Sequence, residues 1–173
     1  MPQFIRFVLP ATIVALSCLP TAAQSGLASS VESPSDTVQT TEAVLAPIHQ
    51  LFDGMRAGDS AAVRAAFDPI ARLVRTSNQN GIPSHRVMSV DDFVTAVGTP
   101  HDVVWDERIW DIRTEIRDNL ASVWMKFAFF AGTQFSHCGV NSAELVNTDE
   151  GWKIVHLADT TQRDGCEMPP ESE

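Results

Sequence analysis

The segment QFSHCGVNSAELV, residues 134–146, contains side chains whose types and spacing could do chemistry. His137 and Asn141 are four positions apart, so in an extended strand they lie on the same face. A histidine there could act as a general base near neutral pH, and the asparagine could polarise a carbonyl group. His156, in the segment WKIVHLAD, is the second candidate for a catalytic base.

Strand alternation predicts which side chains share a pocket with these groups. Glu144 is expected to face water, which turns His137 inward, and Lys126 and Lys153 orient the two neighbouring strands in the same way. A bulge at Gly139 would instead turn His137 outward. The inward set predicted to bind a ligand comprises His137, Asn141, His156, Phe127, Phe129, Phe135, Trp152 and Met125.

The acidic side chains are expected to be solvated. Asp53 lies near the end of the first predicted helix, where a carboxylate exposed to water is the favoured interpretation. Asp159 shares strand parity with Lys153, which places it outside the pocket. The stretch DERIWDIRTEIRD, residues 106–118, predicts a solvated hairpin with cross-strand ion pairs.

Two cysteines follow residue 23, Cys138 and Cys166. An even number of cysteines in an oxidising compartment predicts a disulfide between them, and the alternative is one buried and one exposed free thiol. Neither cysteine has a partner at metal-ligand spacing, so we expect no metal site. The sequence has no phosphate loop, nucleophile elbow or dinucleotide fingerprint, and we expect no cofactor.

The first residues resemble an export signal. Arg6 stands before the apolar run FVLPATIVALSCLP, and the small residues TAA at positions 21–23 suit a signal peptidase. We therefore predict a signal peptide at residues 1–23, cleaved near Ala23, and a protein that is periplasmic or secreted. Pro10 and Pro20 interrupt the apolar run, so stable membrane insertion is not expected. Residues 24–40 are rich in serine and threonine and predict a flexible leader.

The charge of the chain excludes one class of partner. The formal net charge is −10 at pH 7, and no basic stripe with interleaved aromatic residues is present. Such a chain repels a phosphate backbone, so we expect no nucleic-acid binding.

The predicted helices come first in the chain. Apolar residues in TEAVLAPIHQLFDGMRAGD, 41–59, recur at helical spacing, and Gly58 can end that helix in a left-handed conformation. Asp59 is expected to cap a second helix, SAAVRAAF, at 60–67, and Ser89 with Asp92 resembles a capping box that opens a third at 90–97. Between them we predict a strand at 71–76 and a loop, SNQNGIPSH, at 77–85.

Strands follow the helices. Alternating segments at 103–116, 120–130, 134–146 and 152–159 are separated by turn residues and predict an antiparallel meander. This order indicates one α+β domain at 41–165, with helices packed on one face of a strongly curved sheet, and a polar tail at 166–173.

Three segments resemble the nuclear transport factor 2-like superfamily: GMRAGDSAAVRAAFDPIARLVR, NLASVWMKFAFFAGTQFSHCGVNSAELV and DEGWKIVHLADT. They look closest to the branch often labelled as lumazine-binding. The resemblance implies three N-terminal helices on a mainly antiparallel sheet that together form a cone. It also implies dimers that pack sheet against sheet. The superfamily includes enzymes, ligand binders and dimerisation modules, so the fold alone does not select a function.

Several functions follow as hypotheses. The first is an exported protein that binds a small apolar or aromatic molecule, because polar groups converge without a recognisable catalytic set. The second is a lyase or isomerase with His137 or His156 as general base. The third is a structural dimerisation module whose cone is filled by its own side chains. A homodimer is expected through the outer sheet face, where Trp124, Ala128 and Phe130 lie.

Overall fold

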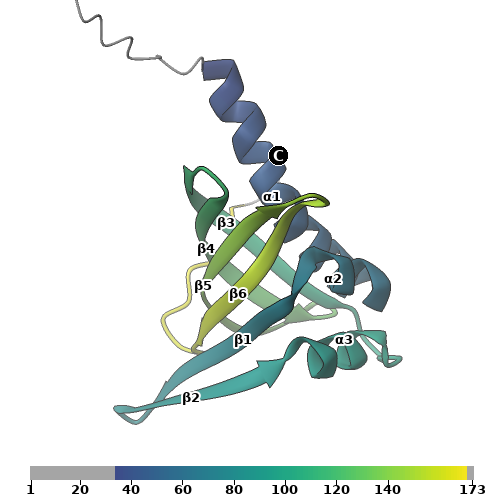
Figure 1. The fold of residues 1–173 in the computed structure, drawn as a ribbon. Coiled ribbons are helices and arrows are strands. Elements are labelled where there is room, and N and C mark those ends of the chain that lie inside the picture. The colour runs from purple at the N-terminus through teal and green to yellow at the C-terminus, as the bar shows by residue number, and fades with distance from the viewer. Residues whose placement is uncertain (1–33, 171–173) are drawn as a thin grey trace, which may run out of the picture. The chain divides into compact units, whose positions relative to one another are not determined.

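The computed structural model describes residues 34–170, which contain three helices and six strands (Figure 1). The predicted signal peptide, residues 24–33 of the predicted leader and residues 171–173 of the predicted tail lie outside the described residues. Within the described range, no helix combines the length and the hydropathy needed to cross a membrane.

The helices occupy the predicted segments, with one difference at the start. Helix α1 (Pro34–Ala57) begins before the expected Thr41. Pro34 is compatible with its first turn, because the N–H groups there have no acceptor within the helix. Helix α2 (Ser60–Ala66) is capped by Asp59, whose carboxylate accepts from two backbone N–H groups. Helix α3 (Val90–Gly98) is capped by the Ser89 hydroxyl, which accepts from the Asp92 N–H at 3.0 Å.

The six strands form one mixed sheet in the order β2-β1-β6-β5-β4-β3. All neighbouring strands are antiparallel except β1 and β6, which run parallel. The strands are β1 (Phe67–Gln79), β2 (Ile82–Ser89), β3 (Trp105–Arg117), β4 (Leu120–Ala131), β5 (Gln134–Thr148) and β6 (Gly151–Thr161).

The prediction of a loop at 77–85 is wrong, because β1 continues to Gln79 and β2 returns beside it (lower left of Figure 1). Asn80 and Gly81 make the turn with φ angles of 55° and 82°. Two successive positive φ angles characterise the two-residue hairpin turn that an Asn-Gly pair favours. The polar residues around this pair hid the hairpin, since β2 is exposed along almost its whole length.

One face of the sheet and the helices enclose the core. The α1 side chains Val44, Ile48 and Leu51 are fully buried, as the helical spacing predicts. From the sheet, the inward residues of β4 and β5, including Met125 and Leu145, are also fully buried in the same cluster. Burial of an aliphatic side chain of this size stabilises the fold by about 1.5–3 kcal/mol.

Two bulges reverse strand parity within β5 and β6. In β5, Phe129 pairs with His137 but Phe130 pairs with Phe135, so Ser136 is an extra residue. In β6, Glu144 of β5 pairs with His156 but Leu145 pairs with Ile154, which leaves Val155 as the extra residue. Before each bulge one parity of residue number faces the core, and after it the other parity does.

Strands β5 and β6 come unusually close at Gly139. A Cβ atom on this glycine would lie 2.1 Å from the carbonyl oxygen of Thr160. The Val140 N–H donates to the Thr160 hydroxyl at 2.9 Å, and Cys138 and Gln162 exchange two backbone hydrogen bonds of 3.0 Å. Gly139 therefore permits a backbone approach that no other residue allows.

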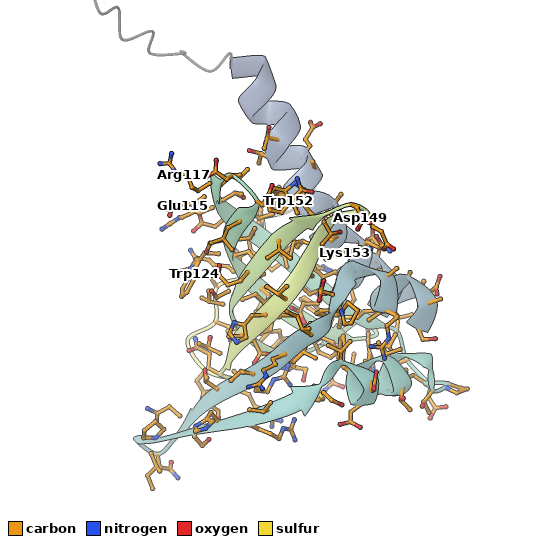
Figure 2. All side chains as sticks on the ribbon, in the orientation of Figure 1. Glu115, Arg117, Trp124, Asp149, Trp152 and Lys153 are labelled. Carbon is orange, nitrogen blue, oxygen red and sulfur yellow. A yellow bond between two sulfur atoms is a disulfide. The ribbon has the colours of Figure 1, made fainter. Side chains whose placement is uncertain are left out.

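The predicted disulfide between Cys138 and Cys166 is confirmed. It ties the segment after β6 to the outer face of β5, and Glu167 then forms an ion pair of 2.8 Å with Lys126 of β4. We call residues 162–170 the C-terminal strap. Ala128, the cross-strand neighbour of Cys138, is fully buried, whereas the sequence placed it on an open outer face. Of the apolar residues predicted there, Trp124 is 49% exposed and points away from the helices in Figure 2.

Replacing Cys166 with serine is expected to release the strap. Without the disulfide, the exposed pair Lys126–Glu167 contributes too little to hold the segment. Amide hydrogen exchange of the strap beyond Gln162, whose backbone pairs with Cys138, should rise to nearly the unfolded rate, while the amides of central β4 stay protected. Unchanged protection of the strap in the variant would show that packing, rather than the disulfide, holds it.

Candidate functional site

A cavity of about 350 Å³ lies between the inner face of the sheet, α1 and α3. Its wall is mainly apolar and aromatic, with Phe52, Met55, Leu73, Phe93, Trp105 and Phe129 among the lining residues. Its polar lining residues are Arg75, Arg86, Glu107, His137, Asn141 and Asp159. An apolar cavity with a few convergent polar groups is typical of small-molecule sites.

Four of the polar residues form one row across the sheet. Asn141 of β5 pairs with Asp159 of β6, which pairs with Arg75 of β1, which in turn pairs with Arg86 of β2. Glu107 joins this row from β3, because the Asn141 side-chain amide donates to Glu107 Oε1 at 2.7 Å. Polar groups therefore extend along one wall from the buried Glu107 to the exposed Arg86.

Glu107 is the most perturbed acid of the site. Its side chain is only 7% exposed, and burial raises its pKa to about 7, against the smaller opposing effect of the Asn141 hydrogen bond. A group that exchanges its proton near neutral pH inside a cavity is suited to acid–base work or to a switchable hydrogen bond. Its place in the site was not predicted, because residues 106–118 were interpreted as a solvated hairpin, although Trp105, Glu107 and Ile109 alternate onto one buried or half-buried face.

Two oxygen atoms of this pair remain available to a ligand. Glu107 Oε2 and Asn141 Oδ1 accept no hydrogen bond within residues 34–170. Neither atom belongs to the buried polar atoms without a partner, which in that range are His137 Nε2 and Thr161 Oγ1. Both oxygens therefore keep some accessible surface, and both residues line the cavity.

His137 lines the cavity, as strand parity predicted, but it presents its ring rather than a free nitrogen. Its Nδ1 lies 3.0 Å from the Ser136 hydroxyl, and its Nε2 is buried without a partner. The ring stacks on Phe129 with centroids 5.0 Å apart and meets Phe127 edge-on at 5.8 Å. Burial, and then the charge of Arg75, lower the His137 pKa, so this imidazole is neutral at pH 7.

Asp159 lies in the pocket, so its predicted position outside is wrong. Its Oδ2 accepts from Arg75 Nε at 2.9 Å and from Nη2 at 2.6 Å, and its Oδ1 accepts from Nε at 3.1 Å. The bulge at Val155 explains the difference, since parity counted from Lys153 reverses there. The pair is partly buried and bidentate, which fixes the Arg75 guanidinium along the wall.

The same bulge removes His156 from the pocket. It pairs with Glu144 of β5 and Arg72 of β1 on the outer face, so the prediction that it lies beside His137 is wrong. Phe135 is likewise displaced by the bulge at Ser136, and its ring packs on Phe130 at 5.8 Å.

The remaining predicted ligand-binding residues belong to the core. Met125 and Phe127 are buried, and Trp152 packs beside the core cluster near α1 (Figure 2), but none of the three lines the cavity. The structure thus brings together His137, Asn141 and Phe129 from the predicted set. It adds Glu107, Asp159, Arg75 and Arg86.

No group of three or more histidine, cysteine, aspartate or glutamate side chains in residues 34–170 could hold a metal ion.

Comparison with known proteins agrees with this architecture. A family model described as "Putative lumazine-binding" matches residues 39–158. No curated protein matches the chain. A nuclear transport factor 2-like protein of unknown function from Shewanella baltica has a similar structure, with a TM-score of 0.58 at 15% identity, covering 73% of this chain and 97% of that one.

Two further solved structures are similar. One is a nuclear transport factor 2-like protein with a cystatin-like fold from Novosphingobium aromaticivorans, with a TM-score of 0.58 at 10% identity, covering 79% of this chain and 94% of its own. The other is titled a "putative dehydratase" of the same superfamily from Streptomyces avermitilis, with a TM-score of 0.56 at 12% identity, covering 73% and 99%. At such identities these structures establish the fold and nothing about chemistry.

Proposed function

The chain belongs to the family described as "Putative lumazine-binding", within the nuclear transport factor 2-like superfamily, and we propose that its pocket binds a small, flat, partly apolar molecule. The observation that carries this proposal is the Glu107–Asn141 pair, which ends an otherwise apolar cavity. In this proposal the helices and the curved sheet close into a hollow cone around the ligand.

The pair suits one kind of ligand head. With a pKa of about 7, a protonated Glu107 can donate a hydrogen bond through Oε2, while Asn141 Oδ1 accepts one beside it. A donor next to an acceptor is complementary to a ring amide, which presents a carbonyl oxygen beside an N–H. Lumazine, after which the family is described, is a flat bicyclic heterocycle with such groups.

The size of the cavity supports a ligand rather than a filled interior. A volume of about 350 Å³ lies in the range of pockets that enclose small organic molecules. Phe127, Phe135 and Trp152, which would have filled a solid cone, lie outside this space. The aromatic rings of Trp105 and Phe129 offer it flat walls for stacking.

A pocket-filling variant tests the proposal. N-phenyl-1-naphthylamine, a neutral fluorescent probe, should bind the wild type and be displaced by lumazine. Ala96→Phe places a ring in the cavity and is expected to weaken both compounds by at least about tenfold, since it removes much of the buried contact area.

Ala65→Phe, on the exposed surface of α2, is the matched control and should bind as the wild type does. The thermal midpoint of each variant checks that it folds. Probe binding that survives Ala96→Phe would place the probe elsewhere and contradict the proposal.

A second candidate, a lyase or isomerase, is favoured by the Glu107 pKa of about 7. The general base would then be Glu107, because His156 faces away from the pocket and His137 Nε2 has no access to it. Glu107→Gln should lower kcat of any such reaction by at least about a hundredfold with little change in KM. A variant that turns over a substrate at the wild-type rate would exclude this role.

We also propose that the protein is exported. The apolar segment at residues 1–23 and the Cys138–Cys166 disulfide support this, because disulfides persist mainly in oxidising compartments. The mature protein is expected to begin near Gln24 when its intact mass is measured after expression. An intact mass that still includes residues 1–23 in the periplasmic fraction would contradict the proposal.

For assembly, we propose a homodimer through the part of the outer sheet face that the C-terminal strap leaves open. Trp124 and Leu120 lie there, 49% and 52% exposed, and the sheet of a second copy would cover both. Light scattering at micromolar concentration should give the mass of two chains, and a monomer would refute this arrangement.

A further inference from the structure

We propose that the ligand of this pocket is an anion, whose carboxylate or similar acidic group is bound by Arg86 at the exposed end of the polar row. The inference names the ligand class of the site proposed above and rests on that proposed function. Arg86 would make the pocket bind anionic molecules more tightly than neutral ones.

The ion pairs of the pocket leave Arg86 uncompensated. Arg75 and Asp159 neutralise each other through their bidentate contact. Arg86 also lines the cavity but forms no ion pair within residues 34–170, so it is the one pocket-lining cation there with a free charge. When Glu107 is protonated, the charged groups of the pocket wall sum to one positive charge.

The position of Arg86 is itself unfavourable without a ligand. It lies directly opposite Arg75 in the β1–β2 pair, and like charges at such positions repel each other. Asp159 compensates only the inner arginine. An anion seated against Arg86 would remove the remaining repulsion, as a bound acid group does in other arginine-lined sites.

The overall charge of the chain explains why an anionic ligand would need a cation at the pocket. With a formal net charge of −10, the protein as a whole repels small anions. A local cation at the cavity mouth is therefore needed if an anionic molecule is to enter. Neutral apolar molecules would need no such group, because the apolar wall alone would hold them.

The two ends of the row define the shape of the ligand. The Glu107–Asn141 pair binds a polar head at the buried end, and the aromatic wall around Trp105 and Phe129 covers the middle. Arg86 binds the acid at the other end. The ligand class is thus a flat, apolar molecule with a hydrogen-bonding head and an acidic tail.

Two probes with one aromatic skeleton test the inference. 8-Anilinonaphthalene-1-sulfonate carries a sulfonate, and N-phenyl-1-naphthylamine has the same rings without it. The wild type should bind the sulfonate more tightly, and Arg86→Gln should weaken sulfonate binding by about fivefold to tenfold while leaving the neutral probe unchanged. Salt should weaken the sulfonate alone.

Arg72→Gln is the matched control. This arginine lies on β1, pairs with His156 on the outer face and is also exposed, so its loss should change neither probe. If Arg86→Gln weakens both probes equally or neither of them, the inference fails while the pocket-binding proposal stands. If neither probe responds to Ala96→Phe, both fail.

Discussion

Gly139→Ala is expected to destabilise the protein by at least about 4 kcal/mol, enough to leave much of it unfolded. The added Cβ would lie 2.1 Å from the Thr160 carbonyl oxygen, so the two strands would have to separate. Separation would break the hydrogen bonds from Val140 to Thr160 and between Cys138 and Gln162. Denaturant unfolding followed by circular dichroism measures this change in the free energy of unfolding.

Gly81→Ala is the control for this prediction. Gly81 has a φ angle of 82° and no neighbour within 4 Å of an added Cβ, so its substitution tests only the cost of backbone conformation. That cost is about 1 kcal/mol. Equal effects of the two substitutions would show that the close approach at Gly139 relaxes without loss.

Glu107→Gln is expected to make the protein more stable than the wild type at pH 8, by about 3 kcal/mol. The folded state raises the Glu107 pKa from 4.5 to about 7, so between these pH values it holds a proton that the unfolded chain has lost. The free energy of unfolding of the wild type therefore falls as pH rises through this window and levels off above it. Glutamine keeps the hydrogen bond from Asn141 and has no charge to bury.

The difference between the two proteins isolates Glu107 from all other titrating groups. Unfolding free energies measured from pH 4 to pH 8.5 should coincide at the acidic end and diverge above about pH 5. Curves that stay parallel across the whole range would mean that Glu107 ionises normally in the folded protein. The variant should keep its affinity for lumazine, since the glutamine amide can accept from Asn141 through its oxygen and donate an N–H to the ligand, as a protonated carboxyl group does.

Local signals in the sequence were sufficient to predict most of the helices and strands. The apolar stripe of α1, the caps at Asp59 and Ser89 and the four long strands from Trp105 onward depend on contacts between near neighbours, and all are present. The hairpin at Asn80–Gly81 had an equally local signal, but its exposed strands lack the alternation that would have supported it.

The interior of the site was harder to predict, because parity fails wherever a bulge intervenes. His137 and Asn141 follow the β5 bulge in the chain, as does Glu144, from which parity was counted. They were therefore placed on the correct face. The β6 bulge separates His156 and Asp159 from Lys153, from which parity was counted. Each of them therefore lies on the face opposite to the predicted one. The apolar residues of β6 could have indicated the bulge. Ile154 and Leu157 are both buried, yet residues three positions apart share a face of a strand only when a bulge lies between them.

The C-terminal strap sets an order on the maturation of the chain. Synthesis runs from the N-terminus, so Cys138 is made well before Cys166, which follows all six strands. In the folded protein the sheet brings these two cysteines to a Cα–Cα distance of 5.8 Å, and until Cys166 has been made the Cys138 thiol lacks this partner. Oxidation that comes too early would leave this thiol to react with another chain, so the timing of oxidation, as well as its extent, determines the yield of correctly bonded protein.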